Sequence, residues 1–487
     1  MSLLIGVDLG TSETKAGLFD TDGSLLRLAR CGYPIITGGE PGSAEQDPEM
    51  WWRAVCQTLR EVAQDVPPGD LAALCVEGQG PSVVMLDGQG RPLYNAILWM
   101  DTRTNAERDE LSKQLGYPVS PFAHVPMAMW LRRHQGQAFQ QARWFLAAWD
   151  FVAFRLCGRP ASSSLAYFQP FPPEETAAVE LPEGLFPSTI EAGHPIDGLT
   201  PSAAEDTGLP AGLPVVAGVH DGISTFIGAG LVSPGRAADV NGTSGGLALC
   251  WNDPINERGI FSASWIHPGE YIVGGAMATL GKCVEWVRDA TGASELSYKE
   301  LIAEAVTTPT GADGLIFLPY LAGERAPIWD PLASGVFFGL TLNHRREHLV
   351  RSVLESVAYA LRHVAEELVG AGARIDQVRV CGRQALSEPW NQIKADVLGL
   401  PVAVPRVREA ALLGAAVLAG VGAGRLPDIT EGANQMVRVD GILDPDPDHH
   451  RLYTERFDVY KRLYPDLRDA FHQLSEITRG GTGESAS

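Results

Sequence analysis

The chain has 487 residues, of which 45% are hydrophobic and 20% are charged, and its formal net charge is −21. This length exceeds what one hydrophobic core usually supports, so we expect a globular protein with at least two domains. The strong negative charge argues against a nucleic acid or an anionic membrane as partner. The 7 cysteines form no CxxC pair, and the sequence has neither a signal-like segment nor an apolar run long enough to span a membrane. These features indicate a reduced protein of the cytoplasm.

The first informative stretch is LIGVDLGTSETKAGLFD, residues 4–20. Two apolar runs flank a small polar turn, a pattern that predicts a β-hairpin. Its turn and second strand supply a glycine, two hydroxyls and a lysine, which are Gly10, Thr11, Ser12 and Lys15. Such a turn can hold a phosphate with its backbone N–H groups, and Asp8 at the end of the first strand can hold a hydrated Mg²⁺. An ordinary surface hairpin explains the same pattern, and the residues alone do not decide between the two.

The remainder of the first half reads as alternating strands and helices. Asp47-Pro48-Glu49 begins a helix, and apolar runs at 71–76, 83–86 and 96–98 predict short strands that end in polar segments. A further strand is expected at 30–36. Helices are expected over 104–154, and loops with one short helix over 158–214. A strand at 214–218 is followed by His220-Asp221-Gly222 and a helix of small residues.

A domain boundary is expected at Val232-Ser233-Pro234-Gly235. Beyond it a second strand, Gly-Thr turn and strand follow, with the turn at Gly242-Thr243. Two such units that begin the two halves predict a duplicated architecture with one phosphate loop in each half. The expected domains are therefore 1–232 and 233–479, followed by a disordered Gly/Ser-rich tail at 480–487.

The second half continues as α/β. Strands are expected at 315–319, 335–340, 377–381 and 401–404, and helices at 348–370, 387–398, 409–421 and 458–474. The helix at 409–421 is so rich in Ala and Gly that it must pack closely against a neighbour.

Seven segments in this order resemble the FGGY carbohydrate kinases of the actin/hexokinase-like ATPase superfamily, and the resemblance runs from Ile5 to about Leu474. They are DLGTSETK (8–15), EQDPEMWW (45–52), AILWMDTR (96–103), VVAGVHDG (215–222), NGTSGG (241–246), FLPYLAGERAP (317–327) and GVFFGLTLNHRREHLVRSVLE (335–355). Within the family the chain is most similar to xylulokinases. The resemblance implies an α/β fold with two ribonuclease H-like domains that flank a cleft, and an enzyme that uses Mg-ATP bound in this cleft to phosphorylate a sugar such as xylulose.

The resemblance also assigns roles to residues. Asp221 matches the catalytic base, although without the family an N-cap role would be the simpler explanation of an Asp before a helix. Asp8 matches the metal-side carboxylate. The residues matched to the nucleotide and its phosphates are Gly10, Thr11, Ser12, Lys15, Gly242, Thr243, Gly281 and Gly382. Close packing of a helix would explain Gly281 equally well. Lys15 could equally be a lysine on a strand that only contacts solvent.

For the substrate, the family places the sugar against the segments 78–82 and 96–103. The expected contacts besides Asp221 are Gly80, Pro81, Trp99 and Asp101, while Arg103 is expected only to pair with Asp101. Trp99 offers an apolar face, and Asp101 offers acceptors for hydroxyl groups.

The chain departs from the family at three places. Xylulokinases carry Met-His, and glycerol kinases Arg-Glu, where this chain has Gly80-Pro81, so xylulose itself is in question. The glycine run at the adenine site reads Gly382-Arg383-Gln384, and a family lysine is replaced by Met127.

Three functions therefore compete. The first is an ATP-dependent kinase of a ketopentose or of another polyol, ketose or aldonate, which has a small-molecule sugar and ATP as its partners and for which a homodimer is left open. The second is a non-catalytic protein that senses a sugar or a nucleotide on the same fold, and the third is a chaperone-type ATPase. Retention of Asp8, Thr11, Asp221 and Thr243 together favours the kinase.

Overall fold

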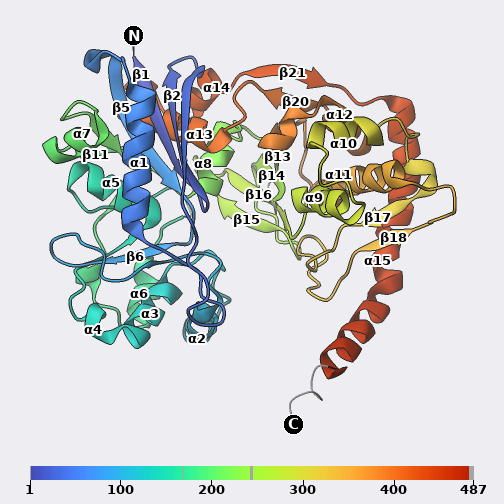
Figure 1. Cartoon of the computed structure of the whole chain (residues 1–487), viewed down its shortest axis with the longest axis horizontal. Coiled ribbons are helices and arrows are strands. Elements are labelled where there is room, and N and C mark those ends of the chain that lie inside the picture. The colour runs from blue at the N-terminus through green and yellow to red at the C-terminus, as the bar shows by residue number, and fades with distance from the viewer. Residues whose placement is uncertain (1, 167, 242–244, 482–487) are drawn as a thin grey trace. The chain divides into compact units, whose positions relative to one another are not determined.

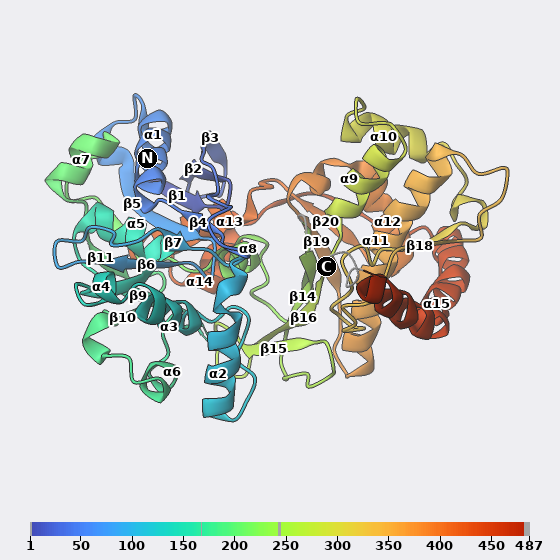
Figure 2. The ribbon, with the colours of Figure 1, turned by 60° about the horizontal axis from the view of Figure 1, so that its bottom comes forward.

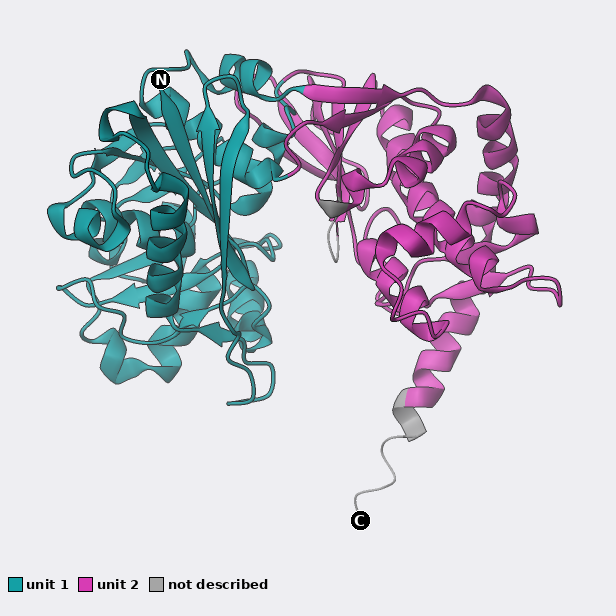
Figure 3. Ribbon diagram, turned by 45° about the horizontal axis from the view of Figure 1, so that its top comes forward, with its two compact units in different colours: residues 1–232, 409–438 teal, residues 233–408, 439–487 magenta. Residues whose placement is uncertain are grey.

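The computed structural model describes residues 2–166, 168–241 and 245–481. They belong to two compact units (Figure 3). Unit 1 comprises residues 1–232 and 409–438, and unit 2 comprises residues 233–408 and 439–487. The segment 409–438, which the sequence analysis places in the second domain, belongs to unit 1 by its packing. The chain returns to unit 1 there because the Ala/Gly-rich helix of this segment packs against the sheet of unit 1.

The main sheet of unit 1 contains the described strands β1 (Leu3–Leu9), β2 (Glu13–Asp20), β3 (Leu25–Gly32), β5 (Leu71–Gly78), β11 (Pro195–Gly198) and β12 (Pro214–Val216). Their order is β11-β12-β5-β1-β2-β3 (Figure 1). β1, β2 and β3 are antiparallel to one another in turn, whereas β5 lies parallel to β1 and β12 lies parallel to β5. The hairpin is thus as predicted, but the third strand begins earlier than expected because a tight turn at Asp20–Ser24 returns the chain at once.

Helices cover both faces of this sheet, so β1 and β5 are buried on both sides. One face packs on α1 (Pro48–Ala63) and α5 (Ala148–Cys157), and the other on α13 (Ala410–Gly422). Gly6 permits the close approach of α13, since a Cβ there would lie 2.4 Å from the carbonyl oxygen of Leu412. Helix α8 (Asp221–Gly228) packs on α13 in turn. Residues that alternate with Gly6 along β1, among them Asp8, therefore face α13.

A smaller sheet of unit 1 has the order β4-β7-β6-β8. Its strands are β4 (Glu45–Gln46), β6 (Val83–Leu86), β7 (Ala96–Ile97) and β8 (Trp144–Ala147), and the neighbouring helices are α2 (Asn105–Leu115), α3 (Val125–His134), α4 (Gly136–Phe139) and α6 (Pro173–Ala178). Both views place α2, α3 and α6 at the same end of unit 1 (Figure 2). β8 interrupts the region that was expected to be helical, because its apolar residues pair with β6 instead. The region 158–214 is also richer in structure than expected, with β9 (Ser162–Ser164), β10 (Thr189–Glu191) and α7 (Pro201–Thr207) in addition to α6 and β11.

Unit 2 repeats the plan of unit 1. The described strands of its main sheet have the order β15-β16-β14-β13-β19-β20-β21. Their bounds are β13 (Arg236–Asn241), β14 (Gly245–Trp251), β15 (Phe261–Ser264), β16 (Tyr271–Met277), β19 (Gln377–Cys381), β20 (Val402–Pro405) and β21 (Val439–Leu443). β13, β14 and β16 are antiparallel in turn, and β19 and β20 follow β13 in parallel, as β5 and β12 follow β1. The predicted α/β class and the duplication of the first strand unit are therefore confirmed.

Long helices of unit 2 pack against one another and on this sheet. The described helices are α9 (Gly281–Ala290), α10 (Tyr298–Ala305), α11 (Arg346–Gly370), α12 (Glu388–Leu398) and α15 (Pro447–Gly481), and a two-stranded sheet of β17 (Ile316–Leu318) and β18 (Val336–Phe338) lies beside them. α14 (Ile429–Met436) lies in unit 1, next to α13. Throughout the described part of the chain, none of the helices has the length and apolarity that a membrane crossing requires.

Candidate active site

The turn between β1 and β2 has its carbonyl groups fixed by the protein. The hydroxyl of Tyr33 donates to the Gly10 oxygen at 2.5 Å, the Gln46 amide donates to the Thr11 oxygen at 2.7 Å, and the Tyr33 N–H donates to the Ser12 oxygen at 3.0 Å. In the described structure the N–H groups of Thr11 and Ser12 have no acceptor within the protein. A turn with its carbonyls fixed and its amides free suits an anion such as phosphate.

Asp8, the last residue but one of β1, lies within a network of charges. Its carboxylate accepts a hydrogen bond from the Lys15 ammonium at 3.0 Å, and Lys15 also lies 3.1 Å from the carboxylate of Glu409. Burial opposes the charged form of Lys15, but the two carboxylates outweigh it and raise the pKa of Lys15. Burial raises the pKa of Asp8, and Lys15 only partly offsets this effect. Lys15 is therefore committed to two carboxylates, and its predicted contact with the nucleotide remains a prediction.

Three carboxyl groups meet at this end of the sheet. Glu77 is the partner of Asp8 in the register between β1 and β5. Burial and the negative charges of Asp8 and Asp221 raise the pKa of Glu77 well above its usual value, and Asp221 contributes in the same sense to Asp8. This mutual influence places the predicted base, the predicted metal ligand and Glu77 in one site. The sequence analysis missed Glu77, although an acidic residue inside an apolar strand was a signal for it.

Asp221 is the first residue of α8, and it does not act as the N-cap of this helix. The cap is His220, whose Nδ1 accepts the Gly222 N–H at 3.0 Å. One oxygen of Asp221, Oδ1, accepts the same N–H at 2.6 Å. Its side chain is 42% exposed, and its other oxygen has no hydrogen-bond partner among the described residues. A carboxylate with one oxygen fixed and the other exposed has the geometry that a general base requires.

The sugar-side segments of unit 1 adjoin this site. Trp99 is 46% exposed, and its indole N–H donates to the Thr11 hydroxyl at 3.1 Å. The carbonyl oxygen of Gly80 lies 2.9 Å from Nε2 of His220. The structure thus brings Trp99 next to the phosphate turn and Gly80 next to the residue that precedes Asp221. Pro81 is buried beside Gly80.

The carboxylate of Asp101 is hydrogen-bonded within the protein. Both of its oxygens accept hydrogen bonds from protein groups, among them the Ala44 N–H at 3.0 Å and the Arg103 guanidinium at 2.6 Å. Arg103 also contacts Glu45 and lies over the Trp130 ring, so the expected pairing of Asp101 with Arg103 is confirmed. The predicted contact of Asp101 with the sugar stays a prediction, since its carboxylate already has partners.

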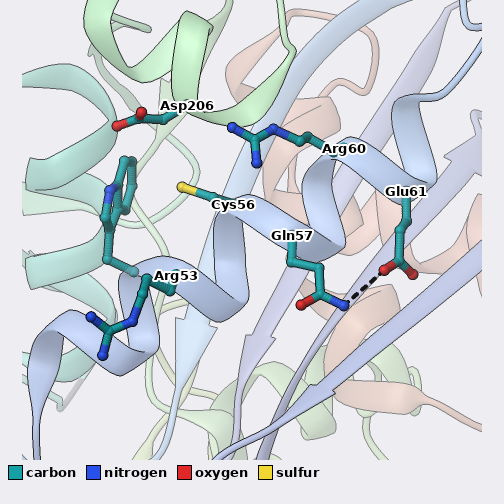
Figure 4. Close-up of a pocket in the computed structure, with 7 residues that line it drawn as sticks. Arg53, Cys56, Gln57, Arg60, Glu61 and Asp206 are labelled. Atoms are coloured by element: carbon teal, nitrogen blue, oxygen red, sulfur yellow. Dashed lines mark hydrogen bonds between the residues drawn. The ribbon is translucent and has the colours of Figure 1, made fainter.

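Unit 1 has two hollows, and only one of them is lined by predicted site residues. One, of about 340 Å³, is lined by Trp99 and Asp101 together with Asn105, Arg108 and Met127. The other, of about 550 Å³, lies between the outer face of α1 and Asp206 of α7 (Figure 4). It contains none of the predicted site residues, and Gln57 on its wall donates to Glu61 at 3.0 Å. The first hollow is therefore the one that contains predicted sugar contacts, Trp99 and Asp101.

In unit 2 the predicted nucleotide residues are only partly described. Gly242 and Thr243 lie outside the described residues. Gly281 is the first residue of α9, and Gly382 follows β19 with a φ of 78°, a conformation that favours glycine. The Gln384 amide accepts a hydrogen bond from Lys394 at 2.8 Å and lies 3.4 Å from Asp239. Its head group is therefore directed at the buried ion pair of Lys394 and Asp239.

Sequence reasoning missed several residues that build the site. Gln46 links the phosphate turn to Gln79, whose amide donates to it at 2.9 Å. Phe122 is 50% exposed, and its ring lies 6.0 Å from that of His220. Glu409 comes from the segment 409–438, which packs in unit 1 although it lies in the second half of the chain. Gln46 and Gln79 stood inside segments named in the sequence analysis, whereas Phe122 and Glu409 had no local signal.

Comparisons with known proteins agree with this geometry. The model of the N-terminal domain of the FGGY family of carbohydrate kinases matches residues 3–228, and that of the C-terminal domain matches residues 237–423. The xylulose kinase of Escherichia coli (strain K12) is 30% identical over 96% of this chain and 99% of its own.

Two further relatives are similar over nearly their whole length. The gluconokinase of Bacillus subtilis (strain 168) is 27% identical over 98% of this chain and 99% of its own. The crystal structure of ligand-bound xylulose kinase from Lactobacillus acidophilus has a TM-score of 0.85 at 25% identity, and the match covers 97% of this chain and 100% of the other. With a charged site at the end of a duplicated sheet and both domain models matched in order, the chain belongs to the FGGY family of carbohydrate kinases.

Proposed function

We propose that the protein transfers the terminal phosphoryl group of ATP to a hydroxyl group of a ketopentose such as xylulose. The observation that carries this proposal is the state of Asp221, which has one oxygen fixed by the Gly222 N–H and the other without a protein partner among the described residues. The free oxygen can accept the proton of the attacking sugar hydroxyl. Asp8 and Glu77 lie in the same site as Asp221.

The turn between β1 and β2 is proposed to bind the phosphates of ATP. The free N–H groups of Thr11 and Ser12 would hold phosphate oxygens, with Gly10 providing room for their approach. In unit 2 the proposed nucleotide contacts are Gly242, Thr243, Gly281 and Gly382. For Gly281 the position at the start of α9 supports a contact with an anion, because the first N–H groups of a helix lack partners within it.

The residues also fit a hydrated Mg²⁺. Among the described residues no group of three or more His, Cys, Asp or Glu side chains is arranged to enclose a metal. Mg²⁺ commonly keeps several waters and takes only one or two carboxylates together with phosphate oxygens. Asp8 would supply such a carboxylate, and the ion would neutralise charge on the phosphates when bound.

A second candidate function is the phosphorylation of an aldonate such as gluconate. The hollow beside Trp99 is lined by Arg108 and Asn105, and the side chains of both are without a protein partner in the described structure. An uncommitted guanidinium can bind a carboxylate in a bidentate manner, and a ketopentose has no carboxylate. The gluconokinase relative is as similar to this chain as several xylulose kinases are.

The experiment is a panel assay of phosphoryl transfer with Mg-ATP and a set of ketoses, polyols and aldonates. Turnover of a ketopentose supports the first candidate, and turnover of an aldonate that is lost in Arg108→Gln supports the second. The matched control is Arg91→Gln, since Arg91 lies on an exposed turn away from the hollow. Absence of turnover on every compound, with ATP binding retained in calorimetry, would instead favour the sensor.

Asp221→Asn tests the base directly. The kcat of this variant is expected to fall by about 10²- to 10⁴-fold, while the affinity for ATP is retained. Asp109→Asn, on the exposed surface of α2, is the matched control. Full turnover of Asp221→Asn would remove Asp221 from the proposed role.

A further inference from the structure

His220 connects the residue that carries the proposed chemistry to the loop in which this chain departs from its relatives. Its ring nitrogens lie 2.9 Å from the carbonyl oxygen of Gly80 and 3.0 Å from the N–H of Gly222. A carbonyl can only accept, so Nε2 must carry the proton, and the neutral ring then leaves Nδ1 to accept from Gly222. One imidazole thus joins the start of α8 to the loop after β5.

The same N–H of Gly222 is shared with Asp221. Oδ1 of Asp221 lies 2.6 Å from this nitrogen and 3.1 Å from Nδ1 of His220. The shared donor fixes Oδ1 next to the imidazole and leaves Oδ2 as the exposed oxygen. The orientation of the Asp221 carboxylate is therefore set jointly by His220 and by the helix start that His220 caps.

The ring of His220 also occupies the space that a side chain at position 80 would need. A Cβ built on Gly80 would lie 2.7 Å from Cδ2 of His220 and 3.1 Å from Cζ3 of Trp149. Trp149 and Phe168 pack against His220, with ring centroids 6.2 and 5.6 Å away, so the imidazole cannot readily move aside. Glycine at position 80 and histidine at position 220 are therefore a matched pair in this chain.

We propose that His220 is a positioning residue that orients the carboxylate of Asp221 and, by filling the space above Gly80, sets the shape of the sugar site. The proposal rests on the proposed function, because it assigns His220 a part in placing the proton acceptor. It also accounts for the loss of larger polar side chains at Gly80-Pro81, since the imidazole takes their place.

The first experiment is a double-mutant cycle of Gly80→Ala and His220→Ala. In the otherwise unchanged protein, Gly80→Ala is expected to lower kcat/KM for the sugar by about 100-fold, because the added methyl displaces the ring and its partners. In the His220→Ala background the same change is expected to cost less than about threefold. Gly88→Ala is the matched control, because Gly88 is exposed and a Cβ added there would have no neighbouring atom within 4 Å. Additive effects would overturn the proposal.

The second experiment separates the two nitrogens of the imidazole. His220→Asn retains a group at the position of Nδ1 and still caps α8, so kcat is expected to stay within about threefold of wild type while the sugar KM rises. His220→Gln retains a donor at the position of Nε2, so the sugar KM is expected to hold while kcat falls by about tenfold. An exposed histidine of unit 1, His194→Ala, is the control. If both variants show the same fall of kcat and the same rise of the sugar KM, a positioning role is contradicted.

Thermal unfolding of the cycle variants keeps the test independent of the sugar. Gly80→Ala is expected to lower Tm in the wild-type background and to leave it nearly unchanged in the His220→Ala background. If no sugar is phosphorylated by the wild-type protein, the proposed function fails, and the Tm cycle still decides whether Gly80 and His220 are coupled. Uncoupled Tm shifts would overturn the pairing even in an active enzyme.

Discussion

Units 1 and 2 share the order and directions of their central strands, but they differ in the charges at the strand ends. In the register of unit 1 the partners of Asp8 are Lys15 on β2 and Glu77 on β5. Counted back from the last pair of each hairpin, the residue of unit 2 that corresponds to Asp8 is Val240. Its partners are Gly246 on β14 and Cys381 on β19. A charged triplet on one sheet is thus replaced by small or apolar residues on the other.

The charges of unit 2 lie on the opposite face of its first strand. Asp239, which corresponds in position to Val7, forms an ion pair with Lys394 of α12, and both side chains are fully buried. Gln384 completes the hydrogen bonding of Lys394. The two units therefore share a fold but not the position of their charged side chains. Unit 1 has charged groups that are partly exposed at the site, whereas the ion pair of unit 2 is buried in the core. The side-chain chemistry of the reaction is therefore expected from unit 1.

The largest expected effect is on the buried pair of unit 2. Lys394→Met leaves the buried Asp239 without its cationic partner, which is expected to lower the free energy of unfolding by about 3–5 kcal/mol. Urea denaturation followed by circular dichroism measures this loss. The double variant Asp239→Leu with Lys394→Met is the control and should recover much of the loss. A single variant as stable as wild type would break the comparison.

The pH dependence of stability should be similar in the two units. Burial raises the pKa of Asp150 in unit 1 and of Glu324 in unit 2 to about 7. Each acid binds its proton more tightly in the folded protein, so its contribution to stability is present below pH about 4 and is lost as the pH rises to about 7. Asp150→Asn and Glu324→Gln are each expected to flatten this decline by at most about 1.4 kcal/mol per pH unit. Urea titrations at pH 4.5 to 7.5 (about the span of both pKa values) test this, and a decline that neither variant changes would contradict it.

The same lysine substitution should act differently in unit 1. Lys15 is partly exposed, so Lys15→Met is expected to cost only about 1 kcal/mol of stability. It removes the positive partner of Asp8, however, and one of the two positive partners of Glu409, so kcat is expected to fall by about tenfold or more. Steady-state kinetics alongside denaturation give both quantities. A loss of stability as large as that of Lys394→Met, with kcat retained, would reverse the contrast between the units.

The smallest expected effect concerns the exposed tryptophans. Trp99→Phe retains the ring face but loses the hydrogen bond to Thr11, so the sugar KM is expected to rise by about two- to tenfold. Trp286→Phe is the matched control in unit 2, where the ring stacks on Phe317. An equal rise of the sugar KM in both variants would argue against a specific role for Trp99.

Much of the fold could be predicted from local patterns. The hairpin at the start of the chain, the helix capped by Asp47 and the helix at 346–370 all follow from apolar periodicity and end signals, which depend on neighbouring residues only. The strand β8 could not be distinguished from a helix, because its short apolar run pairs with the distant β6. For the site, the phosphate turn and Asp221 carried motifs. His220 stood in the same motif as Asp221 and Glu77 stood out as an acid in an apolar strand, but only the contacts of both residues gave them a role.

The sequence by itself therefore determined the class of the fold, the two-part organisation and the residue types that a sugar kinase needs, because motifs and periodicity are properties of contiguous residues. Tertiary structure alone decided that the segment 409–438 returns to unit 1 and brings Glu409 to Lys15. It also decided that His220 fills the space above Gly80, a contact between residues 140 positions apart in the chain. Such long-range contacts follow from packing, which no local pattern encodes.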